Sequence, residues 1–156
     1  MIYVKFEQEI KGTVTVKGHE DWIEFNSYSL SATRHIQVQG ADRDVSHANI
    51  SEFMLTKGAD KTSPEFFIQA LVGTAFTKAT IVVMHASGSG KNGQRLLTIE
   101  LEKPIVSSFS TQCATNGRPE EHLSLNYISI KYTYNHFDGD IEKGSVTKEY
   151  HLFNKA

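Results

Sequence analysis

Apolar and polar residues alternate along most of this chain, and this period of two limits most strongly how the chain can fold. The alternation is cleanest between residues 95 and 103, where Leu97, Ile99 and Leu101 stand opposite polar side chains. Successive side chains of a strand point to opposite faces of a sheet, so such segments predict half-buried strands. Val, Ile, Thr, Phe, Tyr and Trp, which favour strands, make up 51 of the 156 residues. The chain is therefore expected to be mainly β.

Roughly eight strands and one helix are expected, which predicts a single domain over residues 1–156, built as a β-barrel of two packed antiparallel sheets. The expected strands lie at residues 2–6, 22–30, 50–57, 76–85, 95–103, 104–111, 123–134 and 146–153. The run 76–85 is apolar on both faces, which predicts a central strand. The alternation of the run 123–134 slips at Tyr127 and Ile128, which indicates a bulge or a strand that passes between two sheets.

The clearest helical signal lies within residues 60–73. Thr62 and Glu65 match a capping box, Pro64 is tolerated in a first turn, and Gly73 can end the helix. We expect this short helix to plug an open edge or end of the sheets with one apolar side. The residues expected on that side are Phe67, Ala70 and Leu71.

The segment from Thr33 to His47 differs from the rest, because it is polar and charged and holds only scattered aliphatic residues. We expect a long extended loop here. Loops of this length without regular structure are uncommon in compact domains and usually have a function or are mobile. Two interpretations stay open, a flexible hairpin tip and an arm that docks on another subunit.

Charge and cysteine content exclude several classes of protein. The formal net charge is −2 and Lys and Arg form no stripe, which argues against nucleic acid as a partner. The single cysteine, Cys113, excludes an internal disulfide framework and zinc sites built on paired cysteines. No apolar run approaches the ~20 residues that span a bilayer, and the charged residues 1–10 do not resemble a signal peptide. We therefore expect no membrane insertion.

No motif predicts catalysis or a cofactor. Residues 87–92 resemble a phosphate-binding loop, but the required glycine and hydroxyl positions hold His85 and Asn92. None of the seven histidines forms an i, i+4 pair, although histidines from different strands could still converge on a metal. The Asp138–Glu142 segment resembles half of a calcium loop without its glycine, so a solvated turn is the better interpretation. We expect no enzyme activity, no cofactor and no metal.

Three stretches, taken in order, resemble the haemolysin-coregulated protein (Hcp) family, the tube protein of bacterial type VI secretion. They are residues 53–64, with a strand ending in lysine before Asp and Thr-Ser-Pro, residues 97–110, with Val-Ser-Ser-x-Ser, and residues 120–134. Weaker matches lie at residues 12–13 and 23–29. The chain departs from the family in its segment 33–47, which is charged where the family loop is often rich in glycine.

The resemblance implies a structural protein that assembles into a six-membered ring with an open bore. Rings would stack into a hollow tube that carries or chaperones small effectors and works with sheath and spike proteins. The protein would be made in the cytoplasm and secreted through the type VI apparatus without a cleavable signal peptide. By its match to the family pattern, Ser29 is expected to face the bore and contact effectors, with Ser27 and Ser31 as neighbours.

The charged segment then gains an expected role in assembly. We expect Arg34, Asp42, Arg43 and Asp44 to make contacts between neighbouring subunits or stacked rings. Two other functions stay open at this point: a small ligand- or carbohydrate-binding β-sandwich, and a structural protein like that of a phage tail tube. A ring would show a mass of about six subunits in solution, whereas a binding module would be a monomer or dimer.

Overall fold

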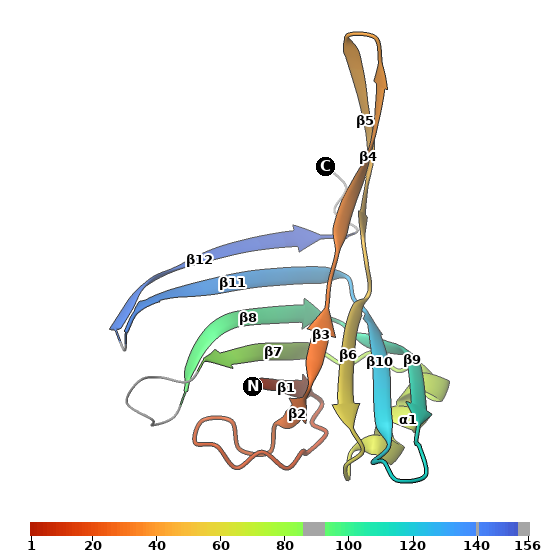
Figure 1. The fold of residues 1–156 in the computed structure, drawn as a ribbon, viewed down its shortest axis with the longest axis vertical. Coiled ribbons are helices and arrows are strands. Elements are labelled where there is room, and N and C mark those ends of the chain that lie inside the picture. The colour runs from red at the N-terminus through yellow and green to blue at the C-terminus, as the bar shows by residue number, and fades with distance from the viewer. Residues whose placement is uncertain (86–92, 140, 153–156) are drawn as a thin grey trace.

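The computed structural model describes residues 1–85, 93–139 and 141–152, and for residues 44–47 it describes the backbone only. The described chain is mainly β with one short α-helix, as the sequence predicts (Figure 1). Its strands are β1 (Ile2–Glu7), β2 (Ile23–Phe25), β3 (Ser27–Ser29), β4 (Ala32–Gln39), β5 (Asp42–Ile50), β6 (Phe53–Gly58), β7 (Lys78–His85), β8 (Gln94–Glu102), β9 (Ile105–Gln112), β10 (Glu120–Asn126), β11 (Ser129–Asp138) and β12 (Ile141–His151).

The strands form two larger sheets and one separate pair. The first sheet has the order β12-β11-β8-β7-β1-β2, the second has the order β3-β6-β10-β9, and β4 pairs with β5. All neighbouring strands are antiparallel. In the described part of the chain neither order returns to its first strand. The expected antiparallel sheets are confirmed, whereas closure of the subunit into a barrel is not.

One continuous hydrophobic core lies between the two sheets. Strands of both sheets contribute buried side chains to it at every second position, because alternate residues face inward. The six-stranded sheet supplies Val4, Phe6, Ile23, Phe25, Ala79, Ile81, Leu97, Ile99, Leu101 and Ile130, and the four-stranded sheet supplies Phe53, Leu55, Val106, Leu123 and Leu125. The sheets therefore pack face to face.

A second, smaller cluster covers the outer face of the six-stranded sheet at β1 and β7 and explains why β7 is apolar on both sides. Val82 of β7 packs there with Tyr3, Val14 and Trp22. The loop that carries Val14 and Trp22 folds back on itself, and a β-carbon on Gly12 would lie 2.2 Å from the Trp22 carbonyl oxygen. Only glycine fits this close approach. The prediction of a central β7 is confirmed, since β7 lies between β8 and β1.

The phase slip near Tyr127 marks the point where the chain passes from one sheet to the other. β10 belongs to the four-stranded sheet and β11 to the six-stranded sheet. Between them the Tyr127 ring is buried in the core, and its hydroxyl donates a 2.7 Å hydrogen bond to the Ser51 carbonyl oxygen. Burial, with a smaller effect of Glu52, raises the pKa of Tyr127 to about 12, so the phenol stays neutral.

Helix α1 (Ser63–Val72) lies where the sequence predicts it, but its start differs from the prediction. Gly73 closes the helix at a φ of 73°, and its N–H donates to the Gln69 carbonyl oxygen at 2.9 Å. The expected capping box is wrong, because no side chain caps the amino-terminal end. Thr62 instead donates its hydroxyl to a carboxylate oxygen of Asp60, which already binds the Thr62 N–H.

The buried face of α1 also differs from the expected one. Of the three expected residues only Ala70 packs against the core, whereas Phe67 and Leu71 are exposed and Phe66 is fully buried. The Phe66 ring lies edge-on against Phe6 and Phe25, at centroid distances of 5.4 and 6.3 Å. The helix does close one end of the space between the sheets, but the side chain that fills this end is Phe66 and not Phe67.

The expected long loop at residues 33–47 is wrong, because this segment forms the paired strands β4 and β5. Their register runs from the pair Ala32 and Ile50 to the pair Gln39 and Asp42, and Gly40 turns the chain with a φ of 62°. In Figure 1 this hairpin, called the arm below, projects far from the sheets. Every side chain of β4 is exposed. A strand with both faces in water needs no apolar alternation, so the alternation rule does not predict β4.

Candidate functional site

The outer face of the four-stranded sheet carries mostly small polar side chains, many of them hydroxyls. Two rows of paired residues cross all four strands: Ser27, Thr56, His122 and Ser110 in one, and Ser29, Met54, Ser124 and Ser108 in the other. The Ser27 hydroxyl is hydrogen bonded to that of Thr56, and the Ser108 hydroxyl donates to that of Ser124 at 2.8 Å. This surface, called the hydroxyl face, is polar but carries little charge, because hydroxyl groups bind water and do not ionise.

The structure brings two of the three predicted bore residues together on this face. Ser27 and Ser29 are both exposed on β3. Ser31 follows the strand at the base of the arm, where its N–H donates to the Ser51 hydroxyl at 2.9 Å. The sequence predicted none of their partners on β6, β9 and β10. The serines at positions 107, 108 and 110 were the available signal, but only the strand register places them beside β3.

The arm carries the charged residues expected to make assembly contacts. Arg34, Asp42 and Arg43 are exposed, and within the described residues none of them has an ion-pair partner. Asp44 lies on β5, and its side chain is outside the described part. Val38 is 64% exposed on the same ribbon. Since an isolated two-stranded ribbon is only marginally stable in water, the arm is suited to pack against another molecule.

A buried ion cluster lies at the end of β6 that is farther from the arm, and it joins β6, β10 and α1. The Lys57 ammonium lies 2.6 Å from a carboxylate oxygen of Glu121, 3.0 Å from Asp60 and 3.2 Å from the Ser63 hydroxyl. Both Lys57 and Glu121 are buried. The sequence predicts Lys57 only as the end of a strand. Phe53, Leu55 and Lys57 are alternate residues of one strand, so their side chains point to the same face of the sheet. This spacing was the signal that the Lys57 side chain points inward.

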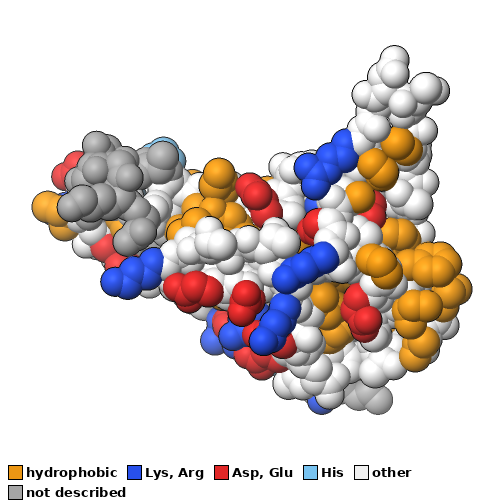
Figure 2. Space-filling model, turned by 90° about the horizontal axis from the view of Figure 1, so that it is seen from below, with side chains coloured by type: hydrophobic (Ala, Val, Ile, Leu, Met, Phe, Trp, Pro, Cys, Tyr) orange, Lys and Arg blue, Asp and Glu red, His pale blue; other side chains and the backbone are white. Residues whose placement is uncertain are grey.

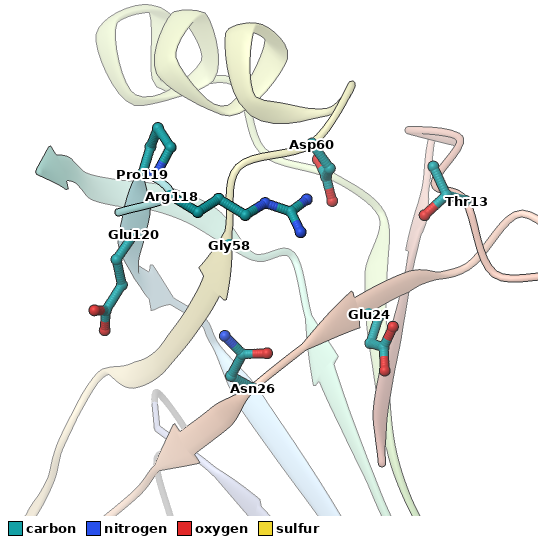
Figure 3. Close-up of a pocket in the computed structure, with 8 residues that line it drawn as sticks. All are labelled: Thr13, Glu24, Asn26, Gly58, Asp60, Arg118, Pro119 and Glu120. Atoms are coloured by element: carbon teal, nitrogen blue, oxygen red, sulfur yellow. The ribbon is translucent and has the colours of Figure 1, made fainter. Parts of the chain in front are cut away.

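Next to this cluster lies an open polar pocket of about 320 Å³ (Figure 3). Its walls come from the loop before β2, the β2–β3 junction, the end of β6 and the start of β10. The lining residues are Thr13, Glu24, Asn26, Gly58, Asp60, Arg118, Pro119 and Glu120. Arg118 reaches into the pocket and donates to the Ala59 carbonyl oxygen at 2.6 Å. Groups of both charge signs line the pocket, so it suits a charged or strongly polar group.

Two exposed apolar surfaces lie on different sides of the subunit. The first is the outer side of α1, with Phe67, Ile68, Leu71 and Val72, and hydrophobic side chains gather on that side in Figure 2. The second is a groove of about 330 Å³ between the base of the arm and the strands β11 and β12, lined in part by Leu30, Ile50, Tyr132 and Tyr150. Exposed apolar surfaces of this kind mark interaction sites.

No group of three potential metal ligands occurs among the described residues. Residues 87–92, which resemble a phosphate loop, and Asp140 of the Asp138–Glu142 segment lie outside the described part. His19 is buried beside Tyr3 and Trp22, and its Nε2 accepts a 3.1 Å hydrogen bond from Arg95. Burial, with the nearby Arg95 charge, lowers the pKa of His19, so this histidine is neutral and belongs to the packing of the outer cluster.

The family model described as "Type VI secretion system effector, Hcp" matches residues 3–134, most of the chain. The chain belongs to the Hcp family. Proteins of the Hcp family serve type VI secretion as structural tube proteins, and it is not a family of enzymes. No helix in the described ranges is long and apolar enough to cross a membrane.

Hcp proteins of known sequence and structure resemble this chain. Protein hcp1 of Pseudomonas aeruginosa is 28% identical over 87 residues, which are 55% of this chain and 52% of that protein, so the match spans about half the length of this relative. A structure described as a type six secretion system protein has a TM-score of 0.87 at 21% identity, covering 97% of this chain and 94% of the other. Hcp1 of Salmonella typhimurium gives 0.77 at 20% identity, with coverage of 97% and 93%. The structural likenesses show that the Hcp fold extends over nearly the whole chain.

Proposed function

We propose that this protein forms six-membered rings that stack into the hollow tube of a type VI secretion apparatus, with the hydroxyl face lining the bore. The observation that supports this most is the four-stranded sheet, which has a polar outer face and two open edges. Membership of the Hcp family supplies the expectation of a tube. The tube would carry or chaperone small effectors, work with sheath and spike proteins, and leave the cytoplasm through the type VI apparatus.

The two edges of the hydroxyl-face sheet suit head-to-tail contact between copies. The strand order leaves β3 at one edge and β9 at the other. Edge strands present unpaired N–H and C=O groups that another chain can meet. When β9 of one copy meets β3 of the next, unlike surfaces join, and such contacts close into a ring if the rotation per copy divides a full turn. The sheet would then close around the bore through several copies instead of within one subunit.

Apolar surfaces flank both edges and support the same contact. Helix α1 packs beside β9, where the Phe67 and Phe109 rings lie 6.2 Å apart, and its outer side is exposed. The groove formed by Leu30, Ile50 and Tyr132 lies where β3 leads into the arm. One copy can therefore place its helix side against the groove of the next, and both surfaces would leave water.

The hydroxyl face suits a bore that releases its cargo. Small hydroxyl groups keep the wall hydrated and form hydrogen bonds that exchange readily with water. Ser27 and Ser29 contribute to this wall from β3, and Ser31 stands at its border with the arm. Weak contacts repeated around a ring would hold a small effector without trapping it.

Light scattering after size exclusion tests the ring. We expect a mass of about six times 17.5 kDa. Leu71→Asp, on the 71% exposed leucine of α1, should release monomers of unchanged fold, because it places a charge in the apolar contact. Lys61→Asp, an exposed change just before the same helix, is the matched control and should leave the mass unchanged. A wild-type monomer or dimer at high concentration would instead favour a small ligand-binding module.

A further inference from the structure

The arm and the polar pocket lie at opposite ends of the strands β3 and β6. β3 leads into β4 at the base of the arm, and β5 returns from the arm to β6, which ends at Gly58 on the rim of the pocket. In Figure 1 the arm extends beyond one end of β3 and β6, and the chain around Gly58 lies at the other end. The arm thus prolongs the direction of strands whose hydroxyl face is proposed to line the bore.

This direction decides between the two neighbours that the arm could reach. Copies that join β9 to β3 are neighbours across the strands, so they lie side by side around the ring. A hairpin that continues along the strands instead leaves the ring at one of its open ends. It therefore points at the next ring, and the face of that ring opposite its own arms presents the pocket.

The charges at the two ends complement each other. Arg43 and Asp42 stand next to the turn of the arm, where their paired residues are Val38 and Gln39, and both are exposed. In the pocket, Glu24 and Glu120 stand on two sides of the entrance and are exposed, and Arg118 reaches between them (Figure 3). An arginine fork suits two carboxylates, and the Asp42 carboxylate suits the Arg118 guanidinium.

We propose that this pocket is the socket for the arm of a copy in the adjacent ring, with Arg43 bound between Glu24 and Glu120 and Asp42 facing Arg118. This inference rests on the proposed tube and names the contact that stacks its rings. A single exposed ion pair contributes little, but each ring carries one arm per subunit, so the contacts act together. Stacking is then directional, because arms point one way and sockets the other.

A charge exchange tests the socket. Arg43→Glu should abolish long stacks in negative-stain images while leaving the ring mass by light scattering unchanged. Adding Glu24→Lys and Glu120→Lys to that variant should restore the stacks, because the charges are then complementary again. The matched control is Lys143→Glu, which makes the same charge change on the exposed strand β12, outside the arm and the pocket, and should leave the stacks intact. Stacks of wild-type length in Arg43→Glu would overturn the proposal.

A cross-link provides a second readout that does not depend on restored charge. In a Cys113→Ser background, Gln39→Cys beside the turn of the arm and Asn26→Cys in the pocket wall leave the proposed ion pairs intact. Together in one chain they should give a ladder of disulfide-linked species on a non-reducing gel under mild oxidation. A link between stacked rings extends along the tube without limit, so the ladder should pass six copies. A link between neighbours within one ring stops at six. Each single-cysteine variant is the control and should give no species above a dimer.

A ladder that ends at six copies, or no ladder from intact rings, would refute the socket while leaving the ring in place. A wild-type protein without ring mass would refute the proposed function, and the socket with it.

Discussion

The two ends of the line formed by β5 and β6 hold similar charged residues in opposite surroundings. At the inner end, Lys57 is enclosed by Glu121, Asp60 and the Phe66 ring, whose centroid lies 5.8 Å from the ammonium nitrogen. At the outer end, Arg43 stands on a ribbon whose side chains are exposed from Ala32 to Arg43. A buried charge must be paired because the interior disfavours it, whereas an exposed charge costs the fold little. The inner end therefore holds the subunit together, and the outer end is available for assembly.

The largest expected difference between these ends concerns their hydrophobic side chains. Phe66→Ala should lower the free energy of unfolding by about 3–5 kcal/mol, because it opens a cavity between the sheets and the helix. Val38→Ala on the arm should change it by less than about 0.5 kcal/mol, because that side chain is already mostly in water. Urea unfolding followed by tryptophan fluorescence measures both. Similar losses in the two variants would show that the arm packs on its own subunit.

The charged residues should show the same contrast at a smaller scale. Lys57→Ala should cost about 3 kcal/mol, because it leaves the Glu121 carboxylate buried without its cation. Arg43→Ala should stay within about 0.5 kcal/mol of the wild type. The double variant Lys57→Met with Glu121→Leu sharpens the test and should recover much of the loss, since no unpaired charge remains. If the double variant were as unstable as Lys57→Ala, the damage would come from packing instead of charge.

Removal of the whole arm should have a small effect on the subunit and a large effect on assembly. Residues 33–49 can be replaced by Asn-Gly, because Ala32 and Ile50 are paired and a two-residue turn can join them. We expect the free energy of unfolding to change by less than about 1 kcal/mol. The number of subunits per ring should stay the same, while stacks disappear. Light scattering and negative-stain images of the same sample check this. Stacks of normal length would exclude the arm from ring contacts.

The smallest expected effect concerns pH and compares a buried with an exposed histidine. The pKa of His19 is lowered in the folded protein, so the unfolded chain binds the proton more readily. The neutral form thus contributes stability that is present above the unfolded pKa of about 6.5 and is lost as the pH falls below it. The wild type should lose more stability between pH 7.5 and 5.5 than His19→Gln, measured by urea unfolding. His35→Gln, which removes an exposed histidine of the arm, should keep the wild-type pH dependence.

Helix α1 shows which features a local sequence pattern can predict and which it cannot. Phe66, Phe67, Ala70 and Leu71 leave the helix apolar on more than one side, so spacing alone does not select the buried face. The packing of Phe6 and Phe25 selects Phe66. Gly73 was predictable because its role needs only a positive φ at the end of the helix. The capping box failed because Asp60, held by Lys57, is the better acceptor for the Thr62 hydroxyl.

The amino-acid sequence by itself determined the mainly β fold, the position of the single helix and the break in alternation near Tyr127, which the structure shows to be a passage between sheets. These features depend on alternation and turn residues within about ten positions of each other. Only the tertiary structure decided that Ser27, Thr56, His122 and Ser110 form one row, that Lys57 meets Glu121, and that the arm and the socket lie at opposite ends. Those relations depend on the register between distant strands, where a slip of one residue would turn every side chain to the other face.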